Sequence, residues 1–162
     1  MVKNNTKSFT MIELLIVSTI ILVLSGVSMA LFFTYRDDKT LSNHVSLFTG
    51  VLELAKNKAS AGDSALCSSS QTAHVNNYSV VVNPTKIIIQ PGCDTIPTPI
   101  NYPVPTNIMY ITPTFSLRFD NQNYQGETRK FPIKDTNTNK CKYVQIDETG
   151  LITNGDCTCP CP

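Results

Sequence analysis

An apolar run over residues 9–33 constrains this chain more than any other feature of its sequence. The 25 residues of the run include one charged residue, Glu13. The run exceeds the roughly 20 residues that a helix needs to cross a bilayer. Lys3 and Lys7 precede it, and positive charge ahead of a span holds the N-terminus in the cytoplasm. We therefore predict a single-pass helix over residues 9–33, with residues 34–162 exported as one globular domain.

The helix is expected to continue beyond the apolar run as an amphipathic helix over residues 34–61. Its apolar residues recur every three or four positions, and this spacing places them on one face. No proline occurs before Pro84, and Ala61-Gly62-Asp63 is a stop signal. Because only one side is apolar, this part should pack against another element. The predicted core face consists of Leu41, Val45, Phe48, Leu52, Ala55 and Ala59.

The rest of the chain has the pattern of an antiparallel β-sheet over residues 65–157. The β-branched runs on either side of Pro84 predict a hairpin, and the alternation of Phe115, Leu117 and Phe119 predicts a half-buried strand. Gly150 can take the positive φ that a short turn between the last two strands requires. The expected class is α+β, with the long helix packed on the sheet. The predicted strands cover residues 78–83, 85–90, 115–120, 129–133, 142–146 and 151–153.

Proline is concentrated in residues 91–113, which contain six of the ten prolines. Proline fixes φ and has no amide hydrogen, so this density excludes a helix or a central strand. We expect an extended surface loop here, with room for a short edge strand at residues 108–112.

All six cysteines lie in the part that is predicted to be exported, where disulfides form. Cys67 and Cys93 bracket the first hairpin, and Cys141 and Cys157 bracket the last one. These four are the disulfide candidates, although six cysteines allow 15 full pairings.

Cys159 and Cys161 are left over by this scheme. Side chains at i and i+2 of an extended segment point the same way, so these two pair poorly with each other. They would bridge elsewhere in the chain, bridge to another chain, or supply thiolates to a soft metal. No histidine or acid pattern completes a metal site, so neither a metal nor a cofactor is expected.

Enzymatic chemistry is not indicated by the sequence. Of the two histidines, His44 lies off the predicted core face and should be exposed, and His74 lies in a polar stretch. Gly62-Asp63-Ser64 is similar to a hydrolase serine motif, but it follows a helix and has no partner pattern. No glycine-rich phosphate loop occurs.

Residues 1–40 are open to three interpretations. A cleaved signal peptide has a charged front and an apolar core, and Ser28-Met29-Ala30 fits its cleavage rule, which would leave Leu31 first. A plain signal anchor explains the apolar run but gives Glu13 no partner, and a lone carboxylate in a membrane costs a few kcal/mol. The third interpretation accounts for Glu13 as well.

The stretch SFTMIELLIVSTIILVLSGV resembles the N-terminal segment of type IV pilins and of type II secretion pseudopilins. The resemblance implies a short leader, residues 1–8, that a prepilin peptidase removes between Ser8 and Phe9. The new Phe9 terminus is usually N-methylated in that family, where glycine usually stands in place of Ser8. It also implies that Glu13 pairs with the α-amino group of a neighbouring subunit's Phe9, so that two charges costly alone neutralise each other during assembly.

Two further stretches narrow the resemblance within the family. LELAKNKASAGDSALC (residues 52–67) and CKYVQIDETGLITNGDC (residues 141–157) are similar to the helix end and the final hairpin of FimT-like and H-type minor pseudopilins. The expected partners are other pilin or pseudopilin subunits, the prepilin peptidase, the inner membrane and its assembly platform.

A nucleic-acid partner is a minority alternative. The chain carries a formal net charge of only +1 and shows no overall basic signature. One local run of basic residues contains a single acid, Asp135, and such a run is usually an exposed, solvated surface. The possible DNA contacts are Arg129, Lys130, Lys134, Lys140 and Lys142.

The sequence thus predicts a minor pilin or pseudopilin, a structural subunit rather than an enzyme. It would sit in the inner membrane and then join a periplasmic or extracellular filament. The alternative is a membrane-anchored binding module of the same fold, for DNA uptake or adhesion, that does not polymerise.

Overall fold

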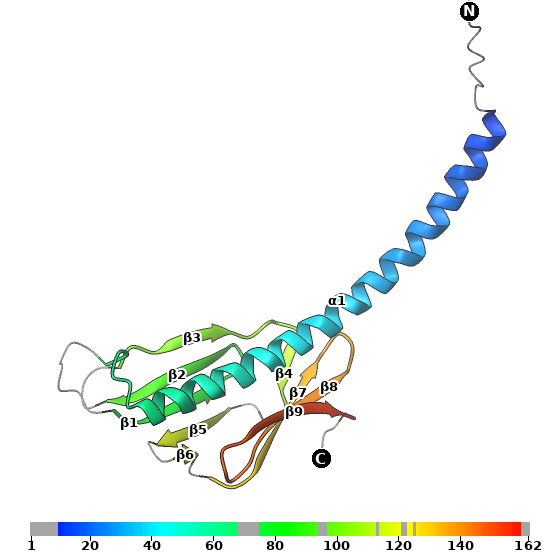
Figure 1. Ribbon diagram of the computed structural model, residues 1–162. Coiled ribbons are helices and arrows are strands. Elements are labelled where there is room, and N and C mark those ends of the chain that lie inside the picture. The colour runs from blue at the N-terminus through cyan, green and yellow to red at the C-terminus, as the bar shows by residue number, and fades with distance from the viewer. Residues whose placement is uncertain are drawn as a thin grey trace, which may run out of the picture. The chain divides into compact units, whose positions relative to one another are not determined.

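The computed structural model describes residues 10–67, 75–93, 97–112, 114–120, 123–124 and 126–159. One long helix, α1 (Met11–Ala61), precedes a series of strands (Figure 1). The chain divides into two compact units, Met1–Arg36 and Asp37–Pro162. The strands are β1 (Val75–Val82), β2 (Lys86–Cys93), β3 (Ile100–Pro103), β4 (Ile108–Tyr110), β5 (Phe115–Asp120), β6 (Asn123–Tyr124), β7 (Arg129–Asp135), β8 (Cys141–Ile146) and β9 (Ile152–Cys157).

The strands form two antiparallel sheets rather than the single sheet that was predicted. One sheet has the order β3-β2-β1-β5-β6 and the other the order β4-β7-β8-β9. The α+β class is confirmed, as are the β1–β2 hairpin around Pro84 and the β8–β9 hairpin, in which Gly150 has a φ of 76°. Period-two alternation shows which side of a strand is buried but not which strand it joins, so the division into two sheets was missed.

The proline-rich segment is not the surface loop that was expected. It contributes β3 and β4, and each of them is the edge strand of its sheet. Ile108 and Tyr110 of β4 are buried in the core. The short edge strand expected at residues 108–112 is confirmed over Ile108–Tyr110. The exclusion of a central strand is wrong at the start of the segment, because Pro91 belongs to β2, which lies between β3 and β1. Pro91 is tolerated there because β3 pairs with β2 only over Lys86–Ile89.

The second half of α1 packs against both sheets, as Figure 1 shows. The six residues of the predicted core face are all buried. Phe48 is fully buried, and its ring contacts Tyr110 of β4, Phe115 of β5 and Phe131 of β7 edge to face. One helical side chain thus links strands of the two sheets.

The C-terminal end of α1 is capped by a left-handed glycine. Gly62 has a φ of 61°, its amide donates to the Ala59 carbonyl (3.2 Å), and the Asp63 amide donates to the Lys58 carbonyl (3.1 Å). This pair of bonds is a Schellman motif. The Asp63 carboxylate pairs with Lys58, and the Asp63 carbonyl accepts a hydrogen bond from the Tyr78 hydroxyl of β1. The end of the helix is thereby tied to the first sheet.

Candidate functional site

Thr10 and Glu13 form a reciprocal cap at the start of α1. The Thr10 amide and hydroxyl both donate to Oε2 of Glu13, at 2.9 and 2.8 Å, and the Glu13 amide donates to the Thr10 hydroxyl at 3.3 Å. This arrangement is the capping box of the pattern T-x-x-E. That pattern was present in the sequence, but the reasoning about Glu13 did not use it. Ser8 and Phe9, the predicted cleavage and methylation positions, lie outside the described residues.

The first unit presents an apolar surface. Every described side chain from Thr10 to Arg36 is exposed, including Ile12 (68%), Leu14 (66%) and Leu22 (72%). A contiguous apolar surface of this extent marks a site that membrane or protein covers. Within the described residues, no helix combines the length and hydropathy needed to cross a membrane. The span predicted over residues 9–33 includes Phe9 and several side chains outside the described set, and it stays a prediction.

The five basic residues proposed as DNA contacts do not all lie on one surface, since one open pocket is lined by Lys134, Lys140 and Lys142 but not by Arg129 or Lys130. On β7 the side chains of Phe131 and Ile133 are buried, so Lys130 and Lys134 point to the opposite side. The Lys130 ammonium lies 5.4 Å from the centre of the Tyr143 ring. Arg129 has the core-side register but is exposed at the strand end.

Carboxylates of the chain itself neutralise the other two basic residues. Lys140 pairs with Asp38 and Lys142 with Asp156, each at 2.6 Å. The hydrogen bond from Lys142 keeps the pKa of the Asp156 carboxyl below its ordinary value. This dispersal and pairing do not favour a phosphate-binding face, which needs several uncompensated cations on one side.

The disulfides follow the predicted scheme in one hairpin and depart from it in the other. Cys67 is bonded to Cys93, as expected. Cys141 is bonded to Cys159, so the expected Cys141–Cys157 bridge is wrong. Cys157 lies directly opposite Cys141 in the β8–β9 ladder, but it is disulfide-bonded elsewhere. Residues two apart point to the same side, so the sequence could not distinguish Cys157 from Cys159 as the partner.

An open pocket of about 730 Å³ lies beside the Cys141–Cys159 bridge, within the second unit. We call it the C-terminal pocket. It is formed by the second half of α1, the β7–β8 connection and the end of β9. Its lining residues are Asp38, Leu41, Ser42, Lys134, Asn139, Lys140, Cys141, Lys142, Asp156, Cys157, Thr158 and Cys159. Nothing in the sequence reasoning predicted this pocket, because it depends on how three separate segments meet.

His44 is buried, which corrects the expectation that it would be exposed. Only 4% of the residue is exposed, and its Nε2 is hydrogen-bonded to the Tyr110 hydroxyl at 2.9 Å. Burial lowers the pKa of His44 to about 4 and raises the pKa of Tyr110. His44 stands three residues after Leu41 and four before Phe48, so it shares their face, and its polarity hid this in the sequence. His74 lies outside the described residues.

Comparison with known proteins bears on the N-terminal segment. Residues 3–29 match the family model of the prokaryotic N-terminal methylation motif. The match confirms the resemblance of this segment to type IV pilins, and a motif of this kind implies a membrane-anchored, exported protein. No curated protein and no solved structure was found to match the chain.

Proposed function

We propose that this chain is a minor pilin or pseudopilin, a structural subunit of a type IV pilus or of a type II secretion pseudopilus. The observation that carries the proposal is the methylation motif at residues 3–29, which overlaps the first part of a 51-residue helix. The antiparallel sheets against the second half of that helix support it, because they form an α+β domain of pilin-like type. The closer likeness to FimT-like and H-type minor pseudopilins belongs to this proposal as well.

The proposed pathway begins in the inner membrane. Residues 9–33 span the bilayer with the N-terminus in the cytoplasm, and a prepilin peptidase cuts between Ser8 and Phe9. Phe9 is then methylated, and an inner-membrane assembly platform moves the subunit into a filament. The exposed apolar surface of the first unit supports this pathway, because lipid would cover the surface in the membrane and neighbouring helices would cover it in the filament.

Glu13 is proposed to pair with the α-amino group of Phe9 of a neighbouring subunit. Both bonds that Thr10 donates end on Oε2 of Glu13, and among the described residues none donates to Oε1, which a charged donor from a neighbour could use. An ion pair inside a bundle of apolar helices forms only where the two charges meet, so it selects one axial offset between neighbours. The same carboxylate would thus start its own helix and set the register of the next one.

A pair of substitutions separates these two tasks of Glu13. Glu13→Gln keeps a cap acceptor, since glutamine also serves a capping box, but it removes the charge. We expect filament incorporation to fall about as far with Glu13→Gln as with Glu13→Ala. Glu53→Gln, an exposed position on the same helix, is the matched control and should assemble normally. Incorporation is measured by immunoblotting of sheared filaments.

Normal assembly of the Glu13→Gln variant would refute the charge-pairing role. Normal assembly of Glu13→Ala as well would favour the alternative of an anchored binding module that does not polymerise.

The processing step has its own test. N-terminal sequencing and intact mass of the mature protein should give Phe9 as the first residue, carrying one added methyl group. A mature chain that starts at Leu31 would instead identify a cleaved signal peptide and overturn the proposal.

A further inference from the structure

The C-terminal pocket brings three cysteines together at an open surface. Cys141, Cys157 and Cys159 all line it, and all three are disulfide-bonded. The pocket thus gives a molecule in solvent direct access to a disulfide. This feature is independent of the assembly segment discussed above.

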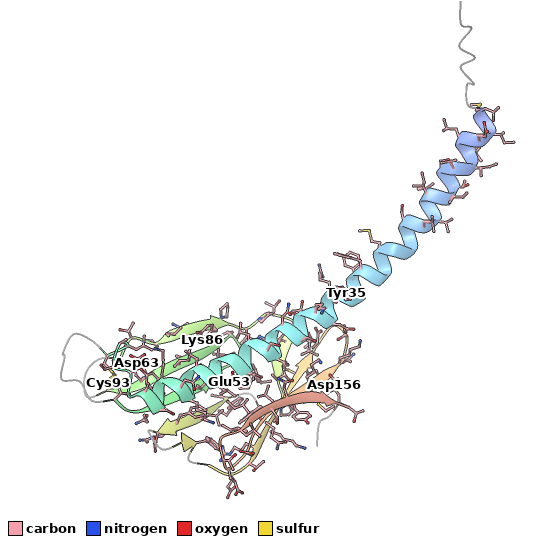
Figure 2. All side chains as sticks on the ribbon, in the orientation of Figure 1. Tyr35, Glu53, Asp63, Lys86, Cys93 and Asp156 are labelled. Carbon is pink, nitrogen blue, oxygen red and sulfur yellow. A yellow bond between two sulfur atoms is a disulfide. The ribbon has the colours of Figure 1, made fainter. Side chains whose placement is uncertain are left out.

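The two bridges with known partners differ in their surroundings. Cys67 packs in the hydrophobic core and Cys93 is half-buried against it. Cys141 is 4% exposed but lies outside that core, and its partner Cys159 is exposed. In Figure 2 the labelled Cys93 and Asp156, which lines the pocket, lie toward opposite ends of the second unit. The Cys159 side of the Cys141–Cys159 bridge is therefore the exposed one, and it lines the open pocket, whereas the Cys67–Cys93 bridge packs against the core.

The charge around the pocket favours sulfur anions. Three of its lining residues are lysines, and Asp38 and Asp156 each neutralise one of them. Within the described part of the chain, the third lysine, Lys134, makes no ion pair. A nearby ammonium group lowers the pKa of a thiol, and it also attracts an incoming thiolate.

From this juxtaposition we propose that the Cys141–Cys159 bridge is a thiol–disulfide exchange site for a dithiol reductant. One thiolate of the reductant attacks the sulfur of Cys159, the exposed residue of the bridge. A mixed disulfide forms there, and the Cys141–Cys159 bond breaks, with its electron pair leaving on the Cys141 sulfur beside the lysines. The second thiol of the reductant then attacks its own sulfur in the mixed disulfide and releases the Cys159 thiolate. Two electrons pass to the protein, and the reductant becomes a cyclic disulfide.

Reduction of this bridge has a local structural effect. The bridge joins the first residue of β8 to a residue beyond the end of β9, with 5.6 Å between the two Cα atoms. The β8–β9 ladder itself does not depend on it, because Cys141↔Cys157 through Ile146↔Ile152 are paired by backbone register. Exchange would therefore release the segment after β9 and leave the sheet in place.

The test uses the full chain in detergent with a limiting amount of dithiothreitol, followed by quenching, alkylation and mass spectrometry. Cleavage before aspartate places Cys141 in residues 135–146, Cys159 in residues 156–162, and both Cys67 and Cys93 in residues 63–93. Fragmentation distinguishes Cys157 from Cys159. We expect Cys141 and Cys159 to be alkylated about tenfold or more faster than Cys67 and Cys93.

Equal rates at the two bridges, or faster reduction of Cys67–Cys93, would overturn the proposal. The core bridge also serves as the internal reference for loss of structure, because unfolding would accelerate both bridges together.

Lysine variants test the electrostatic part. Lys134→Gln should slow the alkylation of Cys141 by about threefold, since one uncompensated charge near the leaving sulfur is removed. Lys86→Gln, a lysine at the start of β2 in the other sheet, is the matched control and should leave the rate unchanged. An equal effect of both variants, or no effect of Lys134→Gln, would show that the lysines do not assist the exchange.

Discussion

At the scale of single residues, the buried pair of His44 and Tyr110 makes stability depend on pH. The folded chain holds the pKa of His44 at about 4, below its ordinary value of 6.5. As the pH falls below 6.5, the unfolded chain takes up a proton first, and so the folded state loses stability. Well above pH 6.5 the histidine is neutral in both states and imposes no penalty.

We expect the free energy of unfolding to fall by about 1.5 kcal/mol between pH 6.5 and pH 5 through His44 alone. Denaturant unfolding at several pH values measures this slope. The double variant His44→Phe/Tyr110→Phe should lack this part of the slope, because phenylalanine has no group that titrates. It should still fold, because both hydrogen-bond partners are replaced by rings of similar size. An unchanged slope in the double variant would assign the pH dependence to other groups.

At the scale of elements, Gly50 inside α1 and Gly62, which caps its C-terminal end, should respond to alanine in opposite directions. Gly62 has a φ of 61°, and a Cβ there would meet nothing within 4 Å, so the cost of Gly62→Ala is purely conformational. It should destabilise the chain by about 1 kcal/mol. Gly50 is helical and also open, and Gly50→Ala should stabilise by roughly 0.5–1 kcal/mol. Thermal unfolding of both variants checks the pair, and the same sign for both would contradict the assignment of the cap.

The elements also show how far the sequence could predict this fold. The core face of α1 was predictable because helical spacing depends only on local order, and the β1–β2 hairpin because Pro84 interrupts two β-branched runs. The role of β4 was not predictable, because Ile108 and Tyr110 lie among prolines and pair with residues of β7 more than twenty positions later. His44 was missed because burial of a polar residue depends on a distant partner, Tyr110.

The candidate site was predictable to a different extent. The block FTMIELL indicated the methylation motif because its residue types are fixed at consecutive positions, and residues 3–29 match that motif. The partner of Cys141 was not predictable, because Cys157 and Cys159 reach the same side. The C-terminal pocket combines α1, the β7–β8 connection and the end of β9, which only the folded chain brings together.

At the scale of the whole molecule, the second unit should fold without the first. Among the residues whose burial the structure describes, the core begins at Leu41 and lies entirely after Asp37. A chain that starts at Asp37 is therefore expected to unfold cooperatively, with the same pH dependence as the full chain. Circular dichroism on heating measures this transition.

Phe48→Ala in this shortened chain is the control for a true core. It should lower stability by about 3–5 kcal/mol, because its ring is fully buried between strands of the two sheets. A shortened chain that shows no cooperative transition, or no response to Phe48→Ala, would mean that the second unit depends on the first.

Strands of the two sheets alternate along the chain, and this determines the order in which strands can pair during synthesis. The strand β4 is synthesised between β3 and β5, yet both of those belong to the other sheet, and its own neighbour β7 comes later. A growing chain presents its N-terminal segments first. The apolar residues Ile108 and Tyr110 therefore stay unpaired until β7 is synthesised, whereas β3 and β5 can already pair within the first sheet. Until β7 is made, this short strand would be an apolar target for a chaperone that shields nascent chains.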